Sequence, residues 1–261
     1  MRARVVSKDG TPIAFERIGE GPPVILVGGG LDDGTENAPL ARELARKFTV
    51  VNYARRGRGE SGDTPPYAVR REVEDLDALV TEVGGPAFLY GVSSGGALAL
   101  EAAALGVAVG KVAVYEVPYL VGEGMVAAWR EYVARLGEAL GRDDRDAALE
   151  LFMRLARASD EEIAGARGAP VWPALVGMAH TLAYDAACLG DGPPPKRLAE
   201  IGQPVLVLTG GGLGGLPGFF DEAADALAAI LPHRERRTIE GTGHVADAGR
   251  VAPVLSEFFT R

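Results

Sequence analysis

A serine between two glycines stands where one predicted element ends and the next begins. The segment 91–95 (GVSSG) begins at the end of the apolar run 86–92 and precedes a helix-forming run. In this context Gly-x-Ser-x-Gly places the serine on a tight strand-to-helix turn, where the glycines give the chain room to turn. Backbone N–H groups at the helix amino terminus can then stabilise an oxyanion. The pattern predicts that Ser93 is a nucleophile, the alternative being a serine of an ordinary turn.

A serine hydroxyl reacts poorly at neutral pH until a base takes its proton, and histidine is the usual base. The chain has three histidines. We expect His180 to lie in a helical segment and His233 to be a solvated residue that follows a helix. His244 comes after the strand-like run 235–240, in a loop at the carboxyl edge of the predicted sheet, where open α/β folds place their catalytic groups. His244 is therefore the candidate base, and its alternative is an exposed loop histidine.

Short apolar runs bounded by turn residues alternate with segments of helical spacing. This order predicts an α/β fold with a mostly parallel central sheet, covered by helices on both faces. The segment 11–18 alternates polar and apolar residues, which is typical of an antiparallel edge strand preceding the parallel set. The apolar runs predicted as buried strands are residues 23–28, 48–53, 86–92, 111–116 and 204–209.

The alternation of strand and helix stops near Val117 and resumes near Gln203. Between them lie two stripes of apolar residues at helical spacing, and the run GDGPPPK ends the segment with three prolines. We therefore predict a core formed by residues 1–117 and 197–261, interrupted by an all-helical insertion at 118–196.

Together these motifs resemble the α/β-hydrolase superfamily, and the resemblance extends over essentially the whole chain. The glycines 28–30 stand where that family has its oxyanion-hole loop, the segment 55–62 (RRGRGESG) resembles its turn after the next strand, and the insertion 118–196 falls where its cap domain falls. The resemblance implies an oxyanion hole made by the amides of Ser94 and of Gly30, or of its neighbour Gly29. A tight turn would also account for the glycines.

The chain departs from this family at three positions. Gly28 replaces the histidine of a His-Gly pair, and Ala54 replaces an aspartate that we expect to be structural. After the strand 204–209, where the family has Gly-Glu-x-Asp, the chain reads GGGL, so Leu213 stands at the position of the triad acid. Loss of that carboxylate would remove the group that orients the histidine.

Some members of the superfamily, including certain haloalkane dehalogenases, take their acid from the end of the strand that follows the nucleophile's helix. Glu116 ends the strand 111–116 in a similar Tyr-Glu context. The resemblance therefore implies Glu116 as the orienting acid, against the alternative of a solvated carboxylate or an arginine partner. Asp221 and Glu222 are the second choice, although acidic residues there also suit a helix amino terminus.

Composition restricts the partners. The 261 residues carry a net charge of −9, which argues against nucleic acid or an anionic membrane as partner. Cys188 is the single cysteine and the sequence has no zinc-ligand spacing, so we expect no disulfide and no metal. The segment 210–215 matches Gly-x-Gly-x-x-Gly, but no helix opens within it, so we expect no cofactor. The chain shows neither a signal peptide nor a membrane span, which makes the cytoplasm its default location.

These features predict a cofactor-independent serine hydrolase with an esterase-like reaction on a small, apolar ester or related acyl compound. Ser93, His244 and Glu116 would form its catalytic triad, with Gly30 and Ser94 in the oxyanion hole. Two alternatives stay open: a lyase or cofactor-free peroxidase of the same superfamily, and a ligand-binding protein that lost its acid. The partner in each case is a small molecule, and the sequence leaves the oligomeric state open.

Overall fold

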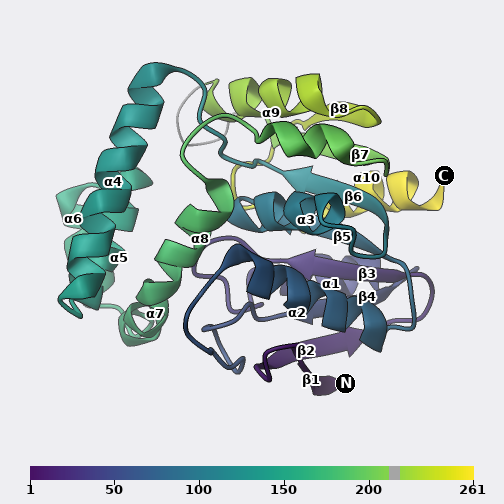
Figure 1. The fold of residues 1–261 in the computed structure, drawn as a ribbon, viewed down its shortest axis with the longest axis horizontal. Helices are drawn as coiled ribbons and strands as arrows, with labels where there is room; N and C mark the ends of the chain where they lie inside the picture. The colour runs from purple at the N-terminus through teal and green to yellow at the C-terminus, as the bar shows by residue number, and fades with distance from the viewer. Residues whose placement is uncertain (212–217) are drawn as a thin grey trace.

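The computed structural model describes residues 1–211 and 218–261, and within them the strands form one eight-stranded sheet (Figure 1). The strand order is β1-β2-β4-β3-β5-β6-β7-β8, and the strands from β4 to β8 run parallel. This confirms the α/β fold with a mostly parallel sheet. The strands are β1 (Arg2–Val6), β2 (Pro12–Ile18), β3 (Pro23–Val27), β4 (Thr49–Tyr53), β5 (Ala87–Val92), β6 (Val109–Tyr115), β7 (Val205–Gly210) and β8 (Arg234–Ile239).

The antiparallel part of the sheet differs from the prediction in one respect. β2 pairs antiparallel with β4, but its other side pairs with β1, so the segment 11–18 is not the edge of the sheet. β1 takes that place, and its half-buried Ala3 and Val5, which alternate with exposed residues, pack against the core. A short strand with two arginines is a common way to end a sheet, since charged side chains discourage pairing with another chain.

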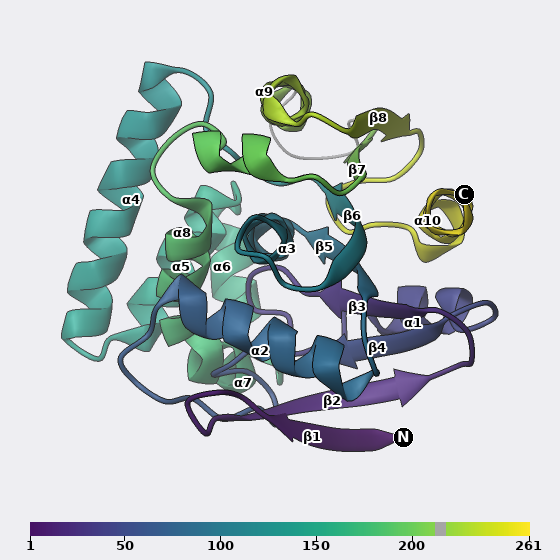
Figure 2. The same ribbon diagram turned by 45° about the vertical axis from the view of Figure 1, so that its right-hand side comes forward.

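Helices cover both faces of the sheet, as Figure 2 shows with the sheet close to edge-on. One face carries α2 (Val69–Glu82), α3 (Ser94–Ala104) and α9 (Phe219–Ile230), and the other carries α1 (Ala38–Leu44) and α10 (Ala248–Thr260). In α2 the buried Val73, Leu76 and Val80 recur at helical spacing, so one stripe of the helix faces the core. The strands β3 to β7 are apolar and buried because helices cover both of their faces.

The segment between β6 and β7 is helical and lies to one side of the sheet (Figure 1). We refer to it as the α4–α8 segment. Its helix α8 packs on α3, the helix that begins beside Ser93. Among the described residues, no helix combines the length and the apolar composition needed to cross a bilayer. The elements of the segment are α4 (Glu123–Gly141), α5 (Arg145–Leu155), α6 (Asp160–Arg167), α7 (Trp172–Met178), the 3-10 helix η1 (Ala179–Thr181) and α8 (Leu182–Leu189), and a second 3-10 helix, η2 (Lys196–Glu200), leads to β7.

Candidate active site

Ser93 occupies a strained turn between β5 and α3. Its φ and ψ are 54° and −128°, a conformation that non-glycine residues rarely adopt and that costs on the order of 1–3 kcal/mol. The turn is tight enough to require glycine on both sides, since a Cβ on Gly91 would lie 2.4 Å from the Gly95 carbonyl oxygen and a Cβ on Gly95 would lie 2.4 Å from that of Gly28. The backbone N–H of Ser93 donates to the Tyr115 carbonyl at 2.9 Å, which ties the turn to β6.

Glu116 and His244 are joined by a hydrogen bond, although 128 positions separate them in the chain. The imidazole Nδ1 lies 2.8 Å from Glu116 Oε2, and Oε1 accepts the Gly210 backbone N–H at 2.8 Å. Because an ionised carboxylate can only accept, Nδ1 must carry the proton of a neutral imidazole, which leaves Nε2 free to accept one. The Glu116 side chain is 5% exposed, whereas that of His244 is 44% exposed.

Gly210 makes room for this carboxylate. A Cβ at position 210 would lie 2.5 Å from the Thr242 carbonyl oxygen, 2.6 Å from the Tyr115 hydroxyl and 3.0 Å from Glu116 Oε1. The glycine that begins the acid-free GGGL segment therefore provides the space and the N–H donor used by Glu116. Leu213, which the sequence places at the usual acid position, lies outside the described residues, as does most of the segment 210–215.

The second choice for the acid has other partners. Asp221 Oδ1 accepts from Arg236 Nη2 at 2.6 Å and from the Thr209 hydroxyl at 2.8 Å, and its side chain is 52% exposed. These contacts fit a surface ion pair near the start of α9. The neighbouring Phe220 has the closer relation to the site, because its ring stacks on the His244 ring at a centroid distance of 4.7 Å. Sequence analysis missed Phe220, since a phenylalanine at the start of a helix carries no distinctive signal.

The glycine loop after β3 lies against Ser93. A Cβ on Gly29 would lie 3.2 Å from that of Ser93, and one on Gly28 would lie 2.4 Å from Asp32 Oδ2. Asp32 is buried and accepts the backbone N–H groups of Gly34 and Glu36, so it organises the loop that leaves this turn. The space taken by the Asp32 carboxylate gives a physical reason why position 28 is glycine here.

Ser93 and His244 line one cavity of about 640 Å³ together with Gly30 and Ser94. These residues and Glu116 follow the strands β3, β5, β6 and β8, whose carboxyl ends meet at one edge of a parallel sheet. The walls are largely apolar and come from the α4–α8 segment and from α9. They include Leu120, Met125, Trp129, Tyr132, Phe152, Leu182, Leu189, Phe219 and Phe220.

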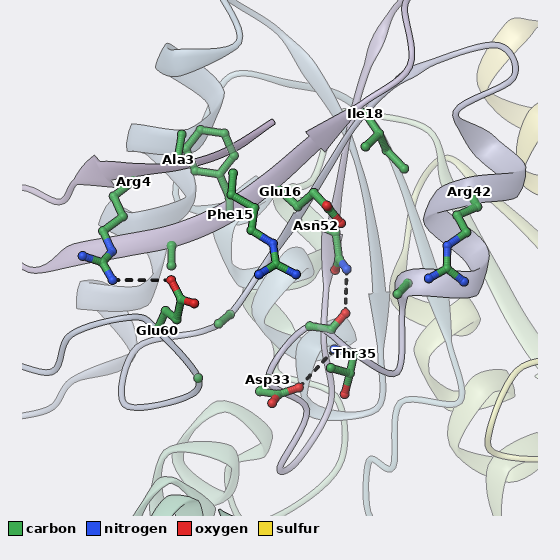
Figure 3. Close-up of a pocket in the computed structure, with 16 residues that line it drawn as sticks. Ala3, Arg4, Phe15, Glu16, Ile18, Asp33, Thr35, Arg42, Asn52 and Glu60 are labelled. Carbon is green, nitrogen blue, oxygen red and sulfur yellow. Dashed lines mark hydrogen bonds and ion pairs between the residues drawn. The ribbon is translucent and has the colours of Figure 1, made fainter.

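A larger hollow, of about 860 Å³, lies elsewhere, beside β1, β2 and β4 (Figure 3). Among the described residues that line it, charges of both signs face one another, and Arg4 pairs with Glu60 at 3.5 Å. Asn52 Nδ2 donates to the Gly34 carbonyl across its floor at 2.6 Å. Neither Ser93 nor His244 lines this hollow, so its greater size does not make it the candidate active site.

His180 and His233 lie apart from the cavity that Ser93 and His244 line. His180 is part of η1, and its Nε2 lies 3.4 Å from Asp63 Oδ2. Burial and the nearby Arg145 charge lower the pKa of His180 below its usual value, which disfavours the charged form. His233 immediately precedes β8, and its backbone carbonyl accepts the Val205 N–H at 2.7 Å.

Fold and site together define an α/β-type hydrolase, and comparison with known proteins agrees. The model of the alpha/beta hydrolase family matches residues 24–254, and the chain belongs to that family. A pimeloyl-[acyl-carrier protein] methyl ester esterase of Xanthomonas oryzae pv. oryzae is 30% identical over 270 residues, which cover 92% of this chain and 96% of that protein. An uncharacterized hydrolase of Bacillus subtilis, YraK, is 33% identical over 96 residues, but the match covers only 35% of each chain.

Solved structures give the same result. An alpha/beta hydrolase from Sphaerobacter thermophilus has 44% sequence identity and a TM-score of 0.87, over 98% of this chain and all (100%) of that one. A thermophilic esterase from Thermogutta terrifontis superposes with a TM-score of 0.74 at 23% identity, covering 100% of this chain and 98% of the other. At that identity the likeness shows the fold alone.

Proposed function

We propose that the protein is a cofactor-independent serine hydrolase that cleaves small, apolar carboxylic esters or related acyl compounds. The observation that carries the proposal is the Glu116–His244 hydrogen bond of 2.8 Å beside a cavity that Ser93 also lines. A buried carboxylate bonded to Nδ1 leaves Nε2 as the proton acceptor that a serine nucleophile needs. The pimeloyl-[acyl-carrier protein] methyl ester esterase that is 30% identical over most of both chains supports ester chemistry.

The reaction follows from the roles of these groups. His244 Nε2 removes the Ser93 hydroxyl proton as Oγ bonds to the carbonyl carbon, and the N–H groups of Gly30 and Ser94 hold the resulting oxyanion. The imidazolium then gives its proton to the leaving alkoxide as the ester C–O bond breaks, which leaves an acyl-enzyme. In the second half, His244 takes a proton from water as the water oxygen bonds to the acyl carbon. The acyl–Oγ bond then breaks, the carboxylic acid leaves, and the imidazolium returns the proton to Ser93 Oγ. Glu116 stabilises the imidazolium in both halves.

The cavity supports a preference for apolar acyl groups. About 640 Å³ accommodates a small ligand, and most of its wall is aliphatic or aromatic. The charged side chains on its wall are Asp185 and Arg157, in addition to the titratable His244, as far as the described residues go. We therefore infer that a small molecule, bound mainly through apolar contacts, is the partner of this site.

A fluorophosphonate probe tests the proposal, because it forms a covalent adduct only with an activated serine. We expect an adduct on Ser93 in the folded protein and its loss in Ser93→Ala, together with loss of hydrolysis of p-nitrophenyl butyrate. An unlabelled Ser93 would refute the mechanism. Turnover of a substrate that Ser93→Ala abolishes, without an acyl intermediate in mass spectra, would instead favour the lyase or peroxidase alternative.

The binding-protein alternative depends on the absence of a triad acid. The contact between Glu116 and His244 places a carboxylate on Nδ1 in place of the acid missing after the strand 204–209, which supports the enzyme over this alternative. Retention of an apolar ligand with no detectable ester hydrolysis would restore it.

A further inference from the structure

A buried arginine from the turn after β4 reaches the back of the oxyanion loop. Arg58 is 1% exposed, and its guanidinium is held on three sides. Its Nη1 donates to the Gly29 carbonyl, its Nη2 donates to Asp185 Oδ1 at 2.7 Å, and its Nε donates to the Thr181 hydroxyl at 3.1 Å. The last two partners belong to the α4–α8 segment, so this arginine connects that segment to the loop.

The Gly29 carbonyl and the Gly30 N–H are the two ends of one planar peptide group. A hydrogen bond from a cation to the carbonyl fixes the plane of that group and polarises it, so the N–H at the other end becomes a stronger donor. The proposed mechanism assigns this N–H to the oxyanion. Arg58 therefore acts on the oxyanion hole from behind, without contact with the substrate.

Asp185 connects Arg58 to the second donor of the oxyanion hole. Its Oδ1 accepts from the Ser94 hydroxyl at 2.7 Å and from Arg55 Nη1 at 2.7 Å, in addition to Arg58. Arg55 Nη1 also donates to the Gly28 carbonyl at 3.3 Å. Burial alone would raise the pKa of the Asp185 carboxyl, but the charges of Arg58 and Arg55 and the Ser94 hydrogen bond hold it below its usual value. Asp185 thus stays ionised between the two arginines.

We propose that Arg58 is a positioning residue for the oxyanion hole, and that Asp185 on α8 makes the α4–α8 segment part of that device. The proposal rests on the proposed function. One carboxylate from the segment contacts both the arginine behind the Gly29–Gly30 peptide and the side chain of Ser94. A displacement of α8 would therefore loosen both oxyanion donors together.

Arg56 provides a matched control in the same turn. It is as buried as Arg58, at 0% exposure, and it also forms ion pairs, with Asp75 at 2.7 Å and Asp9 at 2.9 Å. Its Nη2 donates to the Arg71 carbonyl. These partners lie on α2 and before β2, away from the oxyanion loop. Arg56→Gln therefore reproduces the loss of a buried cation without touching the Gly29–Gly30 peptide.

The experiment compares Arg58→Gln, Arg58→Lys and Arg56→Gln by kcat, KM, melting temperature and inhibition by a trifluoromethyl ketone. This inhibitor forms a tetrahedral oxyanion on the serine and so reports on the hole itself. Direct loss of one oxyanion donor lowers kcat by about 10²–10³-fold, so we expect about 10- to 100-fold for a misplaced one. The inhibition constant should rise by the same factor, with KM within about threefold. We expect Arg56→Gln to lower the melting temperature without this loss.

Asp185 variants give a second test that does not depend on how the arginine variants fold. Among the described residues Asp185 Oδ2 has no hydrogen-bond partner, and an asparagine that keeps its oxygen at Oδ1 retains the acceptor for Arg58 and the Ser94 hydroxyl. We expect Asp185→Asn to keep most of the kcat and Asp185→Ala to lose it as Arg58→Gln does. Rescue by asparagine would show that geometry matters more than charge at this position.

Unchanged kcat and ketone inhibition in folded Arg58→Gln, or equal losses in Arg56→Gln, would overturn the inference. If Ser93 of the wild type reacts with the fluorophosphonate but Arg58→Gln has normal turnover, this inference alone is refuted. A wild-type Ser93 that does not react refutes the proposed function as well.

Discussion

Replacement of Glu116 by glutamine tests the tautomer of the base, because the structure fixes how the new amide must lie. The Gly210 N–H donates to Oε1 at 2.8 Å, and in a glutamine side chain only the oxygen can accept that hydrogen bond. The glutamine oxygen must therefore take the Oε1 position, which directs its NH₂ at His244 Nδ1. Nδ1 then accepts a hydrogen bond, the proton moves to Nε2, and the imidazole can no longer take the proton of Ser93.

The magnitude of this loss is large. The equivalent change of acid to amide in a serine protease lowers kcat by about 10⁴, which corresponds to about 5.4 kcal/mol in the activation free energy. Both hydrogen bonds of the side chain are retained, so the free energy of unfolding should change by no more than about 1–2 kcal/mol. We expect kcat for p-nitrophenyl butyrate and the rate of fluorophosphonate labelling to fall together, while the melting temperature stays close to that of the wild type.

Asp221→Asn is the control for the alternative acid. Its partners Arg236 and Thr209 lie on β8 and β7, and we expect the kcat of Asp221→Asn to stay within about twofold of the wild type. The reasoning is refuted if folded Glu116→Gln keeps more than about a tenth of the wild-type kcat. It is also refuted if Asp221→Asn loses as much activity as Glu116→Gln.

Other changes test the room around the Glu116 carboxylate and the buried charges near the site. Gly210→Ala places a methyl group 3.0 Å from Glu116 Oε1, so we expect kcat to fall by at least about tenfold, and a wild-type rate would show that the carboxylate needs no such room. Glu72→Gln removes one charge partner of the buried Arg55 at 2.7 Å and leaves Asp185, also at 2.7 Å, as the other, so denaturant unfolding at pH 7 should show a loss of up to about 3 kcal/mol. Burial alone would raise the pKa of Glu72, but Arg55 lowers it below the unfolded value of about 4.3. The ionised Glu72 therefore stabilises the fold above that pH, and this stabilisation is lost as the pH falls further. The difference in unfolding free energy between Glu72→Gln and the wild type should shrink below about pH 4, and a constant difference would contradict this assignment.

Local patterns were enough to predict the buried strands of the sheet. Each apolar run predicted as a buried strand corresponds to a strand of the structure within two residues at either end, because such runs have to be covered on both faces. The prediction that the segment 11–18 forms the edge of the sheet is wrong, because β1 pairs with its outer side, and the five residues of β1 give no clear strand signal. The division into a core and an insertion at 118–196 stays a prediction, with helices as the elements found there.

Local patterns were enough to select Ser93 as the candidate nucleophile, because a strand, two glycines and a helix lie within a few residues of it. They also favoured His244 over the other two histidines as the candidate base, because His244 was expected in a loop at the carboxyl edge of the sheet. The contacts between distant segments, in contrast, could be known only from the folded chain. The approach of Glu116 to His244, the space left by Gly210 and the contact of Arg58 with Asp185 depend on parallel strands that end at the same edge and on a helix from α4–α8 that packs over it. No periodicity along the chain encodes such contacts, because each depends on the positions of several elements at once.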